Sequence, residues 1–239
     1  MVTNASADHY SKEEMDEVFD AFIAHLPGPC VDGRANPWPL AADELAQLES
    51  VVPVPGRHNL QNAALAVAMA VRLGAPAAAA IRAMASFGGV ERRLQRHAGV
   101  SGADVFDDYA HNPEKLRAMW TTLAERYPKG VCAVWRPHGY APLRKMMEPL
   151  AEMFAEVVRP QDLLLLLPVY DAGGTADRTV SSDDLVRRLD GRVRVEPVAD
   201  LEAAARRMAA VRNDFGCLVT CGARDPGLPG LARRLAEGV

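Results

Sequence analysis

The segment that decides the fold is 104–113, which reads DVFDDYAHNP. Its first four residues form a short run typical of a β-strand. Pro113 stands where a helix can begin, because the first helical turn does not need the N–H that proline lacks. The same succession of strand and helix repeats to the C-terminus. The predicted strands are 104–107, 131–135, 163–167, 193–195 and 218–220, and the predicted helices are 113–126, 144–157, 182–189, 201–211 and 228–236.

Apolar strands that alternate with helices are typical of a parallel sheet covered by helices on both faces. The fold class predicted for residues 99–239 is therefore α/β, with a doubly wound, mostly parallel, Rossmann-like sheet. Ligands of such sheets bind at the carboxyl ends of the strands. The loops that follow the first three predicted strands are polar and rich in glycine, so the site is expected there.

Residues 1–98 have a different pattern and predict a mainly helical domain with a linker. Apolar residues recur at three- and four-residue intervals near the N-terminus, as in an amphipathic helix. Six prolines between residues 27 and 57 exclude a long helix or a central strand from that stretch. The almost wholly apolar run from Asn59 to Leu73 predicts a buried helix. The predicted helices are 12–26, 41–49, 59–73 and 77–87.

Composition narrows the function classes. Lys+Arg 27 against Asp+Glu 31 gives a net charge of -4, which argues against nucleic acid as a partner. The longest aliphatic run, 163–167, is far shorter than the ~20 residues of a membrane-spanning helix. The first residues do not resemble a secretory signal, so we expect a cytoplasmic protein. The four cysteines contain no C-x-x-C pair, and buried free thiols are favoured over a disulfide or zinc framework.

The loop after the first predicted strand of the α/β domain gathers several groups that could carry chemistry. Asp107 and Asp108 could accept ribose hydroxyls or hold a metal-bound water, and His111 could donate to phosphate or carboxylate oxygens. Asn112 or Asp108 could equally be a helix cap. The residues alone do not decide between capping and function.

A second candidate is the start of the buried helix, where Asn59 and Asn62 lie three residues apart and therefore on one side of the first turn. An amide can pair with adenine, and a helix N-terminus suits the anionic part of a nucleotide. Asn59 is also a plausible N-cap, and the spacing alone favours that interpretation.

A third candidate is the linker pair Arg92 and Arg93, flanked by glycines. Arginine forks suit phosphate oxygens, although a solvated charge pair is the commoner meaning of adjacent arginines. Two further polar loops, 136–144 and 171–178, follow the second and third predicted strands, so they are expected at the same edge of the sheet.

Four motifs, taken in their order along the chain, resemble the Mur ligase family, the ATP-dependent enzymes that build the peptide stem of peptidoglycan. The motifs are 2–9 (VTNASADH), 56–62 (GRHNLQN), 89–93 (GVERR) and 107–113 (DDYAHNP). The segments 137–140 and 169–173 look closest to the branch that adds L-alanine to UDP-N-acetylmuramate. The ligase that recycles a murein peptide is a near neighbour.

The resemblance implies ATP and Mg²⁺ as cofactors. By position, His9 is similar to the family histidine that ligates magnesium in the central ATPase domain. Asn59 and Asn62 are similar to the amides near adenine. Arg93 is similar to the linker arginine that approaches the nucleotide, and Asp108 is similar to the aspartate that binds its ribose.

The resemblance also implies catalytic positions and a substrate. His111 is similar to a histidine facing the reacting centre, and Arg144 to an arginine of the substrate-binding loop. The family reaction activates a carboxylate as an acyl phosphate, which an amine then attacks. A UDP-muramyl substrate is implied, although Gly139 and Pro142 stand where the alanine-adding branch usually carries arginines.

The phosphate loop expected of such an enzyme is not recognisable. Its pattern, G-x-x-x-x-G-K-[ST], requires a lysine after a glycine. The four lysines, Lys12, Lys115, Lys129 and Lys145, all follow other residues. The family's N-terminal domain and much of its central sheet also have no counterpart. We therefore predict residues 1–98 to be a remnant of the central ATPase domain and residues 99–239 to be the C-terminal domain.

Three hypotheses follow. The first is a truncated or divergent Mur-type ligase that does not turn over ATP alone. The second is a non-catalytic nucleotide-binding or interaction module, a half-enzyme whose helix 59–73 is covered by another subunit or by a second copy. The third is an unrelated doubly wound domain. The first two predict a six-stranded, mostly parallel sheet with His111 and Arg144 on one rim.

Overall fold

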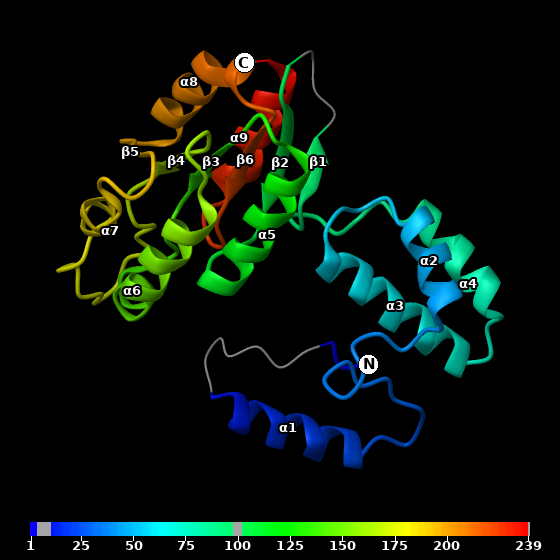
Figure 1. Ribbon diagram of the computed structural model, residues 1–239. Helices are drawn as coiled ribbons and strands as arrows, with labels where there is room; N and C mark the ends of the chain where they lie inside the picture. The colour runs from blue at the N-terminus through cyan, green and yellow to red at the C-terminus, as the bar shows by residue number, and fades with distance from the viewer. Residues whose placement is uncertain (4–10, 98–101, 239) are drawn as a thin grey trace. The chain divides into compact units, whose positions relative to one another are not determined.

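The chain forms two compact units in the computed structural model, Met1–Gly89 and Val90–Val239, called unit 1 and unit 2 below (Figure 1). Residues 1–3, 11–97 and 102–238 are described by the structure. The division falls earlier than the predicted boundary after residue 98. The reason is that a short strand, β1 (Gln95–His97), pairs with the sheet of unit 2.

Unit 2 is built on a six-stranded sheet in the order β1-β2-β6-β3-β4-β5. Among the described strands only β1 is antiparallel to its neighbour, and all other pairs are parallel. The prediction of a mostly parallel α/β sheet is confirmed. The remaining strands are β2 (Asp104–Asp108), β3 (Val131–Trp135), β4 (Leu163–Leu166), β5 (Val195–Pro197) and β6 (Cys217–Cys221).

Helices cover both faces of this sheet, as the doubly wound prediction requires (Figure 1). One face packs against α5 (Pro113–Arg126), α6 (Tyr140–Val157) and α7 (Ser182–Leu189). The other packs against α8 (Leu201–Val211) and α9 (Gly227–Glu237), and a short 3₁₀ turn, η2 (Arg212–Asp214), follows α8.

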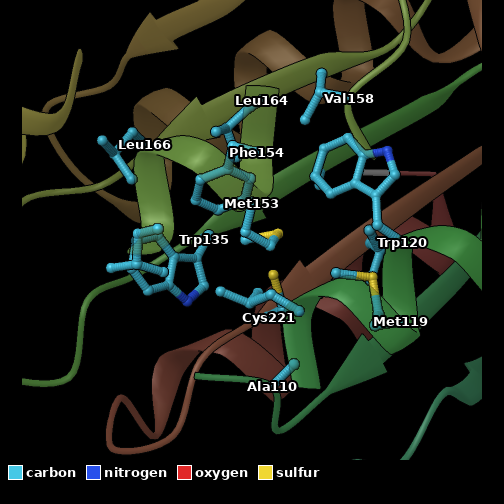
Figure 2. Packing of buried hydrophobic residues seen from close by; sticks show 14 of the residues in the cluster. Ala110, Met119, Trp120, Trp135, Met153, Phe154, Val158, Leu164, Leu166 and Cys221 are labelled. Carbon is cyan, nitrogen blue, oxygen red and sulfur yellow. The ribbon is translucent and has the colours of Figure 1, made fainter. Parts of the chain in front are cut away.

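The central strands are apolar throughout because both of their faces are buried. In β3, Val131, Ala133 and Trp135 belong to the core beneath α5, α6 and α7, whereas Cys132 and Val134 belong to the core beneath α8 and α9. This alternation is the period of two that a strand imposes on its side chains. Figure 2 shows the first core, in which the ring of Phe154 lies 5.6 Å from that of Trp135.

A buried carboxylate ties this core together. Asp162, just before β4, is fully buried and accepts hydrogen bonds from Trp120 Nε1 at 3.0 Å and Val131 N at 2.8 Å, besides an ion pair with Arg159 at 2.9 Å. Burial by itself would raise the pKa of Asp162, but the hydrogen bonds from Arg159 and Trp120 outweigh it and hold the pKa below its ordinary value. One side chain thereby links α5, β3 and β4.

In unit 2 one strand was missed and several element bounds differ from the prediction; β5, for example, is Val195–Pro197 rather than 193–195. β1 was missed because its three residues, QRH, form a polar edge strand without an apolar run. α6 begins at Tyr140 rather than at residue 144. Pro142 lies in the first turn of this helix, where its missing N–H breaks no helical hydrogen bond.

Unit 1 is helical, as predicted. Its helices are α1 (Lys12–Ala24), α2 (Ala42–Val51), α3 (Arg57–Arg72) and α4 (Ala77–Ala83), followed by the 3₁₀ turn η1 (Met84–Ser86). The middle of α3 is buried in a small core with Leu48 of α2 and Ile81 of α4. Its C-terminal end is not covered within the unit, since Val71 and Leu73 are exposed.

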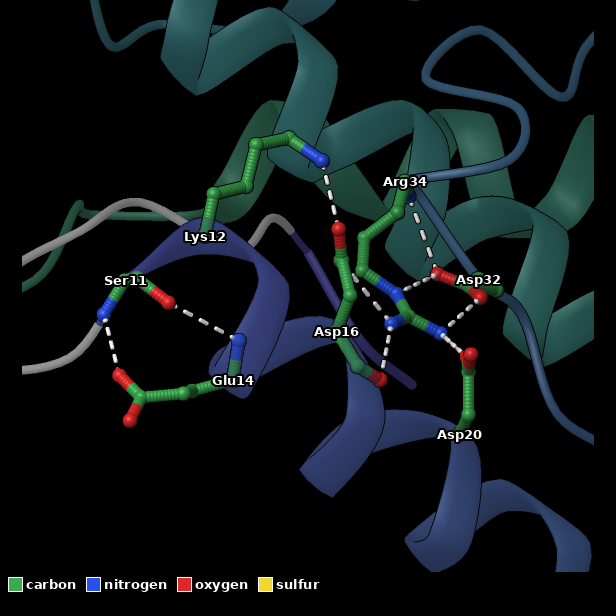
Figure 3. A network of polar contacts seen from close by, with 7 residues as sticks. All are labelled: Ser11, Lys12, Glu14, Asp16, Asp20, Asp32 and Arg34. Carbon is green, nitrogen blue, oxygen red and sulfur yellow. Dashed lines mark hydrogen bonds and ion pairs between the residues drawn. The ribbon is translucent and has the colours of Figure 1, made fainter.

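Helix α1 is attached differently, because none of its residues is buried. Figure 3 shows Arg34 between Asp16 and Asp20 of α1 and Asp32, which it approaches at 3.2, 2.7 and 2.7 Å. The hydrogen bonds that Arg34 donates to Asp32 and Asp20 raise the pKa of its guanidinium. Ion pairs of Arg34 therefore attach this helix to its unit.

The four cysteines are free thiols, as predicted; Cys132, Cys217 and Cys221 are buried and Cys30 is half-buried. No helix in the described part of the chain has the length and apolar character needed to cross a membrane.

Candidate functional site

The candidate site is the carboxyl edge of the unit 2 sheet. β2, β6, β3 and β4 are neighbours and run parallel, so the loops that follow them leave the sheet at one edge. The loops also bond to each other: Gly222 N donates to Asp108 O at 3.2 Å, and Tyr170 N donates to Pro137 O at 2.8 Å. The predicted polar loops therefore form one continuous rim.

Two buried aspartates end β2. Asp107 accepts from Thr220 Oγ1 at 2.8 Å and from Arg92 Nε at 3.0 Å. Asp108 accepts from the backbone N–H groups of Leu94 at 2.6 Å and Ala110 at 2.7 Å. Burial raises the pKa of both carboxyls, that of Asp108 to about 6, against the opposing hydrogen bonds. Asp108 thus fixes the backbone of the rim directly, and Asp107 joins the side chains of Thr220 and Arg92.

The linker segment against these aspartates is strained. Arg92 and Leu94 have positive φ values, 58° and 44°, which side chains other than glycine rarely adopt. Besides Asp107, the guanidinium of Arg92 donates to Gly222 O at 2.5 Å and to Ala223 O at 3.2 Å. Arg92 therefore joins the linker to β2 and to the loop after β6.

A row of rings and cations lies on the rim. The guanidinium carbons of Arg92 and Arg93 lie 5.0 and 5.9 Å from the ring centre of Tyr109. The ring of Tyr109 meets that of His111 edge-on at 5.5 Å, and His111 meets His138 at 4.9 Å. Since His138 follows β3, the row joins loops from two strands that β6 separates. We call Arg93, Tyr109, His111 and His138 the rim row.

Arg136, in the loop after β3, binds residues of the loops after β6 and β4. Arg136 pairs with Asp225 at 2.6 Å, donates to Pro168 O at 3.1 Å and lies over the ring of Tyr170 at 5.5 Å. Asp225 also accepts from Gly227 N at 2.8 Å at the start of α9. The carboxylate of Asp225 therefore bonds to Gly227 N within the partly glycine-rich loop after β6 and to Arg136 from the loop after β3.

The other predicted residues lie in several places. Arg144 is in the second turn of α6, on the side of the loop after β4, where it pairs with Asp177 at 2.9 Å. Asn59 lies in the first turn of α3 and its amide donates to Pro55 O at 2.6 Å, while Asn62 is exposed. Gly56, with φ 102°, is the N-cap residue of α3, so the N-cap interpretation of Asn59 is wrong. His9 lies outside the described residues.

The described residues do not provide a magnesium site. They contain no group of three or more His, Cys, Asp or Glu side chains that could hold a metal ion. Among the carboxylates on the rim, Asp107 accepts from Thr220 and Arg92, Asp108 accepts from two backbone N–H groups, and Asp225 pairs with Arg136. The magnesium prediction rests on His9 and stays a prediction.

Comparison with known protein families shows to which family the chain is related. The family described as "Mur ligase, glutamate ligase domain" matches residues 92–224, more than half of the 239 residues. The chain belongs to the Mur ligase family. The matched stretch contains β2, β3, β4 and β6, and hence the rim as far as residue 224.

Curated Mur ligases give the same relationship. The chain is 37% identical over 190 residues to the UDP-N-acetylmuramate–L-alanine ligase of Rhizobium meliloti (strain 1021), which covers 78% of this chain and 40% of that protein. The corresponding ligase of Burkholderia multivorans is 34% identical over 200 residues, covering 80% of this chain and 42% of its own. The chain spans about two-fifths of the length of these relatives.

Solved Mur ligase structures share the fold. The UDP-N-acetylmuramate–alanine ligase of Thermotoga maritima superposes with a TM-score of 0.58 at 23% identity, over 76% of this chain and 37% of that one. MurF of Acinetobacter baumannii gives a TM-score of 0.57 at 19% identity, over 77% of this chain and 38% of its own. At these sequence identities the similarity establishes a shared fold.

The structure brings together some of the predicted residues in unit 2 and adds others. Arg93 and His111 meet at the ring of Tyr109, which the prediction quoted but gave no role, and Asp108 precedes Tyr109 in the chain. His138 is the second addition, and its place beside Pro137 in a quoted motif was the available signal. Arg92 and Asp107 were recognised as charged but not as partners, because 15 residues separate them in sequence.

Proposed function

We propose that this chain is a divergent Mur-type ligase of peptidoglycan biosynthesis whose unit 2 keeps a nucleotide-facing surface and that these 239 residues do not turn over ATP on their own. The observation that carries the proposal is the rim row, in which a cation, a phenol ring and two imidazoles touch in sequence across two loops. It lies at the strand edge where sheets of this type bind their ligands.

Each group in the row has a chemical use toward a nucleotide. Tyr109, at 36% exposure, offers a ring face on which a base can stack. The exposed guanidinium of Arg93 suits phosphate oxygens. His111 and His138 can donate to phosphoryl or carboxylate oxygens. Asp108 has further lone pairs after accepting its two backbone bonds, so it can still accept a ribose hydroxyl.

The substrates proposed are those named for the curated relatives, UDP-N-acetylmuramate and L-alanine, with ATP and Mg²⁺ as cofactors and a cytoplasmic location. Inactivity of the chain alone is proposed because none of its lysines follows a glycine, as the phosphate loop requires. A ligase of this kind depends on fixed charges around the transferred phosphoryl group.

Nucleotide binding is tested by titrating the chain with a non-hydrolysable ATP analogue by calorimetry. Arg93→Gln and Tyr109→Ala should each weaken binding about 10-fold, because a charge-assisted contact or a stacked ring contributes about 1–3 kcal/mol. Arg126→Gln is the matched control, an exposed arginine at the far end of α5. Equal affinity in all four proteins would overturn the assignment.

Turnover is tested separately by phosphate release from the purified chain with ATP, Mg²⁺, UDP-N-acetylmuramate and L-alanine. The proposal predicts release at the background rate. Release well above background, lost in His111→Ala, would show that the chain is active alone.

A second candidate function, association with another subunit or a second copy, is favoured by unit 1. Helix α1 buries no residue and exposes Val18 by 62% and Phe22 by 52%, four residues apart on one face. The end of α3 exposes Leu73 by 68%. Apolar groups gathered on one face are typical of interaction surfaces. A monomer in sedimentation equilibrium that does not bind a hydrophobic dye would count against this function.

A further inference from the structure

The loop between β4 and α7 is exposed and is held in place by polar contacts. Its nine residues 171–179 are all exposed, and only Val169 and Val180, just outside this segment, are buried. We call residues 171–179 the strap. Gly173 and Gly174 both have positive φ, 81° and 75°, which lets the strap reverse direction. The strap has no apolar anchor of its own, so its position depends on polar contacts.

The first of these contacts occupies Arg144. One nitrogen of its guanidinium, Nη2, lies 2.9 Å from Asp177 Oδ2, 3.3 Å from Asp177 O and 2.9 Å from Thr179 Oγ1. Thr179 N in turn donates to Asp177 Oδ1 at 3.0 Å, which orients the carboxylate. The strap thus presents a carboxylate to Arg144 in the manner of an anionic ligand.

The second contact lies one helical turn away. Arg178 pairs with Asp171 at 2.8 Å, and its guanidinium carbon lies 5.7 Å from the ring centre of Tyr140. Tyr140 and Arg144 are four residues apart on α6, so they lie on the same face of the helix. Both ends of the strap are therefore held against the first two turns of α6.

These contacts are reversible. Arg144 is 44% exposed and Asp177 58% exposed, so water and dissolved ions reach both partners of the pair. An exposed ion pair of this kind shifts an equilibrium only about two- to fivefold. A dissolved carboxylate or phosphate group can compete with Asp177 for the same guanidinium, because it offers the same acceptor oxygens.

We propose that the strap is a built-in competitor of the site: Asp177 keeps Arg144 occupied, and an anionic ligand opens the strap by taking the place of that carboxylate. This deepens the proposed function, on which it rests in taking Arg144 as an anion-binding residue of the same rim. The ligand class is a small molecule that carries a carboxylate or a phosphate.

The test uses inorganic phosphate as the probe and tryptic cleavage of the Arg178–Thr179 bond as the readout, measured by mass spectrometry at constant ionic strength set with sodium chloride. The wild-type chain should be cleaved about three times faster in saturating phosphate than in chloride alone. Asp177→Asn should be cleaved at the faster rate without phosphate. Arg144→Gln should also be cleaved fast, and phosphate should not change its rate.

Asp183→Asn is the matched control, since it removes the same charge from an exposed residue of α7 that forms no ion pair with the described residues. It should behave as wild type. Equal cleavage rates in Asp177→Asn and Asp183→Asn, or an acceleration by phosphate in Arg144→Gln as large as in wild type, would overturn the proposal. Calorimetry with the ATP analogue reports separately on the proposed function, since phosphate can open the strap whether or not the nucleotide binds.

Discussion

Removing Arg92 should destabilise unit 2 strongly. Arg92→Ala takes away the ion pair to Asp107, two hydrogen bonds to Gly222 and Ala223, and the cation above Tyr109. Asp107, whose side chain is fully buried, then keeps Thr220 as its one remaining side-chain partner of those described above. Breaking a buried pair on one side costs about 3–5 kcal/mol, because it leaves a buried charge without compensation.

The dependence on pH separates this mechanism from simple loss of packing. Burial already raises the pKa of Asp107 above its ordinary value, and losing Arg92 should raise that pKa further. An acid with a raised native pKa loses stability as the pH rises through that pKa. The gap between wild type and variant should therefore be widest near pH 8 and narrow toward pH 4.

Urea denaturation followed by circular dichroism measures both effects. The matched control is Arg96→Ala in β1, whose pair with Asp104 at 2.7 Å is exposed and contributes about 0.2–1 kcal/mol. A loss in Arg92→Ala no greater than that in Arg96→Ala, or a gap independent of pH, would refute the reasoning.

Three further predictions concern other points of unit 2. Asp162→Ala should lose about 3–5 kcal/mol in urea denaturation, because it strands the indole N–H of Trp120 in the core; a loss comparable to that of the exposed control Glu202→Ala would contradict this. Gly222→Ala should cost about 2–4 kcal/mol in the same assay, since φ is 146° and the new Cβ would lie 2.9 Å from Leu228 Cδ1; Gly230→Ala, with open space around it, should be neutral or stabilising. The native pKa of Asp108 is about 6 and its ordinary value is 3.8, so its contribution to stability is full below about pH 4 and about 3 kcal/mol of it is lost as the pH rises through 6. The stability of Asp108→Asn relative to wild type should therefore rise over that range. An unchanged difference between the two proteins would count against a raised pKa.

The sequence predicted the order of elements in unit 2 because the strands are apolar on both faces. A short apolar run such as Leu163–Leu167 is most easily explained as a buried strand in a chain that alternates strands and helices. β1 could not be predicted, because an edge strand needs only one partner and its residues carry no apolar signal. The early start of α6 depended on Gly139 and Pro142, whose role is set by backbone geometry.

The sequence predicted which loops form the candidate site, but it did not predict the contacts between their side chains. Topology places the loops after β2 and β3 at one edge, so Asp108 and His111 could be expected there. The contact of His111 with His138 could not, because it depends on β6, the last strand in the sequence, lying between β2 and β3. The partners of Asp108 were hidden for a similar reason: Leu94 lies 14 residues earlier, beyond a turn of the chain.

The most direct test of the central claim, that the rim of unit 2 is a nucleotide-facing surface, is a map of backbone amide chemical shifts in the whole chain during titration with a non-hydrolysable ATP analogue. We predict that the largest changes fall on residues 92–94, 107–112 and 136–139, and that they shrink in Arg93→Gln. Changes confined to other parts of the chain, or none at millimolar analogue, would contradict it.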